Sequence, residues 1–139
     1  MNSKQITTPR QDSWLAGLPV LVLFLVLVLV LGSGCGQSAR PSDHEEGRKA
    51  LQATLDTWKS GGKPDTLARQ SPSIHASDGD WMSGLALQGY QADEGRLVGS
   101  DLNYSVVLEL KNRRGRVTKK TAVYAVTTHP QLLILRQDD

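Results

Sequence analysis

The sequence predicts an α+β protein: one long helix packs on an antiparallel sheet of about four strands, behind an N-terminal apolar signal or anchor helix. Three observations support this class. Twelve consecutive apolar residues, Val20 to Leu31, precede the only cysteine of the chain, Cys35. Apolar residues then recur with helical spacing around 51–58, and they alternate with polar residues over 102–110, as in a half-buried strand.

The length and charge of the chain limit its function. We divide it into a signal peptide at 1–34, a cysteine with its tether at 35–42, and one small α+β domain at 43–139. From residue 35 onward, fourteen Lys and Arg stand against thirteen Asp and Glu. A nucleic-acid-binding domain would show a clear basic excess, so we expect no nucleic acid among the partners.

The first 34 residues have the three parts of an export signal. Lys4 and Arg10 provide positive charge, and the apolar run has the expected length of roughly 7–15 residues. The small residues Gly32 to Gly34 give a protease access to the backbone. The sequence therefore predicts export, with cleavage before Cys35.

This junction resembles the lipobox of bacterial lipoproteins, in which a branched apolar residue and two small residues precede a lipidated cysteine. Ser33, Gly34 and Cys35 match the pattern, whereas Gly32 stands where the family prefers Leu. The resemblance implies that acyl chains on Cys35 anchor the domain in the cell envelope, and we expect no other cofactor. The lone cysteine agrees with this, because a free thiol is unusual in an oxidising compartment.

Two alternatives to lipidation stay open. Leu15 to Leu31 just reaches the roughly 17 residues that a membrane-spanning helix needs, although it includes Gly17 and Pro19. Simple secretion after cleavage is the other alternative. Each of the three outcomes places the C-terminal domain outside the cytoplasm.

A tether and a helix follow the cysteine. Gly36–Ser42 is rich in Gly, Ser and Pro, and as a short coil it reaches roughly 15 Å. Ser42 is the predicted N-cap, Glu45 completes a capping box, and Gly61-Gly62 ends the helix. One face of the helix repeats apolar residues, namely Leu51, Leu55 and Trp58.

The strands come after the helix. Short strands are predicted at Ile74–Ala76 and Leu85–Tyr90, and the clearest alternation covers Leu102–Lys111. Asn112–Gly115 then forms a hairpin turn, because glycine accepts a positive φ, and Val117–Thr128 is the return strand.

The last strand, Leu132–Leu135, has four consecutive apolar residues, which predicts a central strand buried on both faces. The order of elements resembles cystatin-like and nuclear-transport-factor-2-like domains, in which a sheet curls around an N-terminal helix. The region from Glu45 to Arg136 also resembles a planctomycete-like family of small lipoproteins, through Trp58, Asp80-Trp81 and Tyr124–Thr128. Both resemblances imply a fold and no activity.

Two side-chain clusters are candidate sites. His75, Asp78 and Asp80 offer an imidazole and two carboxylates, which suit a hard cation or acid–base chemistry. Their spacing matches neither task well, so we favour a polar turn that caps its segment, with Trp81 in the core. We identify no metal site.

The second cluster is basic and gathers on the predicted hairpin. Its members are Lys111, Arg113, Arg114, Arg116, Lys119 and Lys120. Such a tip suits anionic headgroups or an anionic envelope polymer; the alternative is a solvated hairpin whose charges protect a sheet edge. No aromatic residue is interleaved for stacking on bases.

We therefore expect a lipid-anchored, non-catalytic binding or assembly domain at the membrane of the cell envelope, with an envelope protein or polymer as partner. Two alternatives are a single-span membrane protein with the same outer domain and a small pocket enzyme or ligand binder of nuclear-transport-factor-2-like type. The pocket enzyme would use His75, Asp78 or Asp80. No catalytic constellation is evident in the sequence.

Overall fold

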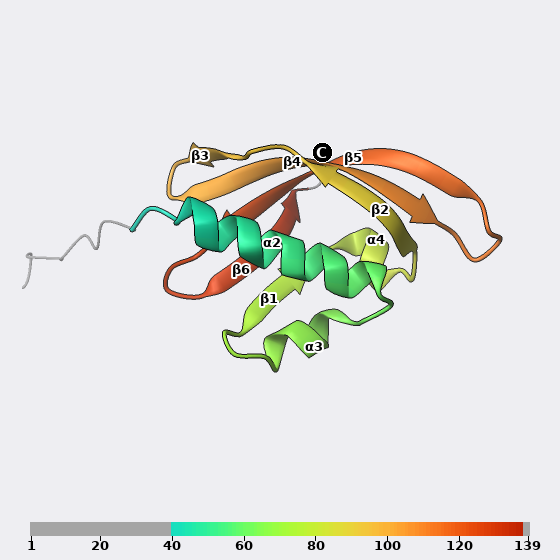
Figure 1. The fold of residues 1–139 in the computed structure, drawn as a ribbon, viewed down its shortest axis with the longest axis horizontal. Coiled ribbons are helices and arrows are strands. Elements are labelled where there is room, and N and C mark those ends of the chain that lie inside the picture. The colour runs from blue at the N-terminus through green and yellow to red at the C-terminus, as the bar shows by residue number, and fades with distance from the viewer. Residues whose placement is uncertain (1–39, 138–139) are drawn as a thin grey trace, which may run out of the picture. The chain divides into compact units, whose positions relative to one another are not determined.

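The computed structural model describes residues 40–137. The predicted signal segment and Cys35 lie outside the described residues. The domain is α+β, as predicted, and its sheet curls over the helices (Figure 1). The helices are α2 (His44–Lys59), α3 (Pro64–Ala68) and α4 (Gly79–Met82). The strands are β1 (Ile74–Ser77), β2 (Ala86–Ala92), β3 (Arg96–Val98), β4 (Asp101–Lys111), β5 (Val117–Thr127) and β6 (Leu132–Gln137).

The sheet is mixed and six-stranded, so the prediction of an antiparallel sheet of about four strands is wrong in the number of strands and in the direction of β1. Its order is β1-β6-β5-β4-β2, with β3 also paired to β4. β1 runs parallel to β6, with Ile74 opposite Leu132, and the other pairs are antiparallel. β1 has four residues and β3 has three. Segments this short carry little pattern, and nothing local in them indicates their pairing partner.

α2 packs its apolar side against one face of the sheet (Figure 1). Leu51 and Leu55 on this side are each 1% exposed, and Trp58 is also buried. Asp43 caps the helix by accepting a 2.8 Å hydrogen bond from the Glu46 backbone N–H. The predicted cap at Ser42 is therefore wrong by one residue.

Ser42 instead fixes the start of the domain to one end of the sheet. Its backbone N–H donates to the Ser100 carbonyl at 2.8 Å, and its hydroxyl oxygen accepts from the Thr128 N–H at 3.0 Å. The Asp43 N–H donates to the Thr128 hydroxyl at 2.9 Å. The chain therefore enters the domain beside the start of β4 and the end of β5.

The β4–β5 hairpin follows the predicted alternation. The inward side chains of β4 are all buried, namely Leu102, Tyr104, Val106, Leu108 and Leu110. On β5 the first five residues, Val117 to Thr121, are exposed, and burial begins at Ala122. The hairpin therefore extends beyond the core (Figure 1).

β6 lies between β1 and β5, but only one of its faces is buried. Leu132 and Ile134 point into the core, whereas Leu135 is 39% exposed on the opposite face. The prediction that both faces are buried is wrong, because α2 and α4 supply buried residues to only one side of the sheet.

Candidate functional site

The turn at the end of the β4–β5 hairpin is held by the side chain of Asn112. Its Oδ1 accepts hydrogen bonds from the backbone N–H groups of Arg114 and Arg116 at 2.9 and 3.0 Å. The Asn112 N–H donates to the Arg116 carbonyl, and Gly115 adopts a φ of +80°. These bonds fix the backbone from which the arginine side chains project.

Of the six basic residues predicted to form one tip, two are neutralised lower on the hairpin. Lys119 Nζ lies 2.9 Å from Glu109, and Lys120 Nζ lies 3.2 Å from Asp80. The other four are exposed and, within residues 40–137, have no carboxylate at ion-pair distance. We call these four the basic tip: Lys111, Arg113, Arg114 and Arg116.

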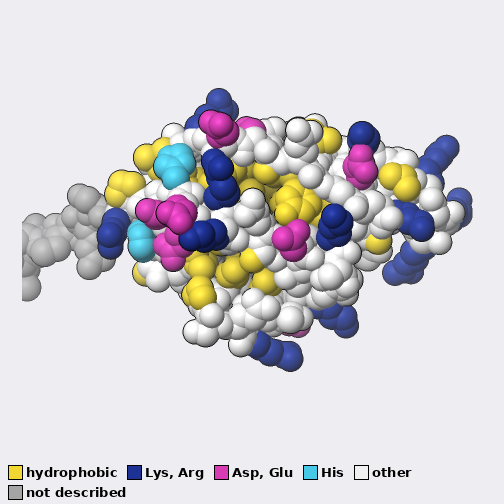
Figure 2. Space-filling model, in the orientation of Figure 1, with side chains coloured by type: hydrophobic (Ala, Val, Ile, Leu, Met, Phe, Trp, Pro, Cys, Tyr) yellow, Lys and Arg dark blue, Asp and Glu magenta, His cyan; other side chains and the backbone are white. Residues whose placement is uncertain are grey.

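The basic tip and the entry point of the chain lie at opposite ends of the domain. β4 has eleven residues, from beside Ser100 to the tip. At about 3.3 Å per residue, the strand is roughly 33 Å long. Figure 2 shows basic side chains gathered at the far end of the longest axis, away from the side on which the described chain begins.

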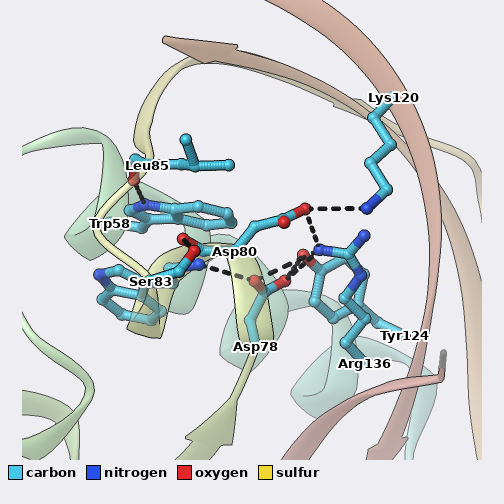
Figure 3. Close-up of polar contacts among 9 residues, drawn as sticks. Trp58, Asp78, Asp80, Ser83, Leu85, Lys120, Tyr124 and Arg136 are labelled. Carbon is cyan, nitrogen blue, oxygen red and sulfur yellow. Dashed lines mark hydrogen bonds and ion pairs between the residues drawn. The ribbon is translucent and has the colours of Figure 1, made fainter. Parts of the chain in front are cut away.

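Asp78 lies at the centre of a buried polar cluster on the helix-covered face (Figure 3). The residue is 3% exposed and caps α4, accepting a 2.9 Å hydrogen bond from the Trp81 N–H. Its carboxylate also accepts from the Tyr124 hydroxyl at 2.5 Å and lies 3.3 Å from the Arg136 guanidinium. This is the geometry of a capping turn, with Trp81 in the core.

Asp80 joins the same cluster from the first turn of α4. Its carboxylate accepts from Arg136 at 2.5 Å and from Lys120 at 3.2 Å. Burial acts to raise the pKa of Asp80, but the hydrogen bonds and charges of Arg136 and Lys120 outweigh it and lower that pKa. The pKa of Tyr124 is raised by burial and by the Asp78 carboxylate. The two carboxylates of this cluster, Asp78 and Asp80, are thus matched by two cations, Arg136 and Lys120.

The structure does not bring His75 to the two carboxylates. His75 follows the buried Ile74 in β1 and is exposed on the other face of the strand, near Ser73. Among the described residues, no group of three or more potential ligands is placed to hold a metal. Clefts of about 600 and 700 Å³ lie at the two ends of α2, and neither is lined by His75, Asp78 or Asp80.

Trp58 and Trp81 stack with their ring centroids 5.5 Å apart and their planes inclined by 13°. Each indole N–H is used by a backbone carbonyl: Trp58 donates to Leu85 at 2.8 Å and Trp81 to Gly62 at 3.0 Å. The pair therefore ties α2 to α4, and ties each helix to the segment that follows the other one, which is a structural role.

Sequence reasoning did not connect Tyr124 and Arg136 with the carboxylates. The alternation of β5 places Tyr124 on the inner face, and Arg136 continues the inward positions of β6 after Leu132 and Ile134. A charged residue in an inward position requires a buried partner. The inward position of Arg136 was therefore a sequence signal for a buried carboxylate beside it.

Comparison of the chain with protein-family models, curated proteins and solved structures found no match. Between residues 40 and 137, no helix has the length and apolar character needed to cross a membrane. The basic tip combines four exposed charges, which have no carboxylate at ion-pair distance within residues 40–137, with a turn held by hydrogen bonds.

Proposed function

We propose that this protein is a lipid-anchored, non-catalytic component of the cell envelope that binds an anionic envelope polymer through its basic tip. The acyl chains on Cys35 hold the protein to a membrane, and the α+β domain presents the tip. The observation that carries the proposal is the set of four exposed basic side chains at a hydrogen-bonded turn, for which the described part of the chain supplies no carboxylate at ion-pair distance.

The distribution of charge supports a local binding surface. The chain from residue 35 onward is nearly neutral, yet the basic tip concentrates four positive charges within six residues. Repeating phosphate or carboxylate groups provide complementary charge, and a turn fixed in advance loses little conformational entropy on binding.

Polymer binding is tested with two charge-matched triple variants of the lipidated protein. Arg113→Gln, Arg114→Gln and Arg116→Gln together remove three charges from the tip. If each contributes about 1 kcal/mol, as basic residues do near an anionic membrane surface, binding weakens roughly 100-fold. The probes are poly(glycerol phosphate) and polygalacturonate, which separate phosphate from carboxylate recognition.

The control variant neutralises exposed basic residues elsewhere, namely Lys59, Lys63 and Arg69, each to Gln. It carries the same net charge as the tip variant, so an effect of overall charge would weaken both equally. Equal binding by the tip variant and the wild-type protein would overturn the assignment of the tip, as would equal weakening in the two variants.

The anchor is tested by intact mass of the membrane-extracted protein beside a Cys35→Ala variant. A chain that begins at Cys35 and carries acyl mass, absent from the variant, supports the lipoprotein proposal. An unmodified full-length mass would instead support the single-span alternative, in which the apolar run from Val20 to Leu31 remains in the membrane.

A further inference from the structure

β3 exposes two adjacent apolar side chains. Leu97 is 46% exposed and Val98 is 50% exposed, and Arg96 beside them is exposed as well. Successive residues of a strand point to opposite faces, so Leu97 and Val98 lie on opposite faces of β3, and their exposure shows that neither face is covered at these positions. We call Leu97 and Val98 the β3 patch.

The β3 patch lies at the end of the domain where the chain enters. Val98 pairs with Asp101 across a tight turn through Gly99 and Ser100. The Ser100 carbonyl accepts the 2.8 Å hydrogen bond from the Ser42 N–H. The patch is therefore two residues from a direct contact with the last residue of the tether, and Figure 1 shows β3 and the start of α2 at the same end.

The length of the tether restricts what covers the patch. Seven peptide units join Cys35 to Ser42, and by covalent length alone they span at most roughly 25 Å. Since Ser42 is fixed to the turn beside the patch, a lipid on Cys35 holds this end of the domain close to the bilayer. The anchor keeps the patch at a high effective concentration near the membrane, so even a weak contact forms.

We propose that the β3 patch inserts into the headgroup boundary of the bilayer that holds the Cys35 lipid. This inference rests on the lipid anchor of the proposed function. Leu97 and Val98 stand on opposite faces of β3 beside the turn, so both side chains reach this boundary when the end of the hairpin points into it. Arg96, next to the patch, lies at headgroup level.

The contact orients the domain. With the β3 patch at the bilayer and β4 running roughly 33 Å from that end, the basic tip points away from the anchoring membrane. The tip then faces polymer beyond the membrane, and the headgroups under the anchor lie out of its reach.

The test uses a fluorescent label on the full-length, lipidated protein in phosphatidylcholine vesicles. Cys35 is the only native cysteine and is blocked by lipid, so Val98→Cys introduces a single reactive thiol for an environment-sensitive nitrobenzoxadiazole dye. Arg114→Cys at the tip and Lys63→Cys on the flank, both exposed, are the matched controls. Vesicles with and without nitroxide-labelled lipids report contact with the bilayer.

The proposal expects a blue-shifted emission at position 98 that falls at least twofold with nitroxide lipids, and water-like, unquenched emission at 114 and 63. Water-like emission at 98 on protein of verified acyl mass would overturn the inference and leave the anchor intact. A blue shift at 98 that nitroxide lipids do not quench would mean that a second copy or another protein covers the patch, which also overturns it. Absence of acyl mass would overturn the anchor and the inference together.

Discussion

At the scale of single residues, Asp78 shows how a surface-like motif becomes part of the core. The residue is nearly inaccessible to water, and the Tyr124 hydroxyl, the Trp81 N–H and Arg136 surround its carboxylate. A buried carboxylate that loses a donor retains the cost of its desolvation. We therefore predict that Tyr124→Phe lowers the free energy of unfolding by about 1–3 kcal/mol, measured by urea denaturation.

The control for this substitution is Tyr90→Phe. The Tyr90 hydroxyl also donates to a carboxylate, that of Asp56 at 2.9 Å, but this pair lies at the surface, where water replaces a lost donor. We expect a change below about 1 kcal/mol. Equal losses of unfolding free energy in Tyr124→Phe and Tyr90→Phe would show that the burial of Asp78 does not determine the effect of losing its donor.

Asp80 links the cluster to pH. Its pKa in the folded protein lies below the ordinary value of 3.8, because the attraction of Arg136 and Lys120 outweighs desolvation. A lowered folded-state pKa contributes stability above the unfolded-state pKa, and this contribution is lost as pH falls through the folded-state pKa. We predict that Asp80→Asn is less stable at pH 7 and loses less stability between pH 5 and pH 2 than the wild type. The measurement is the free energy of unfolding of both proteins as a function of pH. Equal losses in the variant and the wild type between pH 5 and pH 2 would contradict the prediction.

At the scale of elements, the parts predicted well are those whose burial follows a long local pattern. β4 alternates over eleven residues, so its inner face and the turn after it are readable from the sequence. β1 and β3 are short, and β1 gains its place by pairing with β6 nearly sixty residues later. The candidate carboxylates could be predicted because they lie close together in the sequence. Their partners on β5 and β6 could not, because they are 46 and 58 residues away from Asp78.

The hairpin turn allows a sharp test of an element. Gly115 has a φ of +80°, which costs an L-residue roughly 1–2 kcal/mol, and its N–H bonds back to Asn112. We predict that Gly115→Ala reduces hydrogen-exchange protection of the Arg116 amide and weakens polymer binding. Gly79→Ala is the control, because its φ is not positive and an added methyl there meets open space. Unchanged protection at Arg116 would mean that the turn tolerates a side chain at this position.

At the scale of the whole molecule, two sets of charges have different surroundings. The carboxylates of Asp78 and Asp80 and their partner Arg136 lie largely inside the domain, whereas the basic tip is in solvent at the end of a hairpin. Salt shortens the Debye length from about 10 Å at 0.1 M to about 3 Å at 1 M, and buried pairs are screened much less than exposed charges.

A single salt titration therefore distinguishes the binding role of the basic tip from the stabilising role of the buried cluster. We predict that raising the NaCl concentration from 0.05 to 0.5 M weakens polymer binding more than tenfold, because every attraction at the tip is exposed. Over the same range the free energy of unfolding changes by less than about 1 kcal/mol, because the exposed ion pairs contribute little and the buried cluster is shielded from ions. Both quantities are measured on the same preparation, by light scattering with poly(glycerol phosphate) and by urea denaturation. Salt-independent binding would show that apolar contacts or hydrogen bonds, rather than the charges of the tip, hold the polymer.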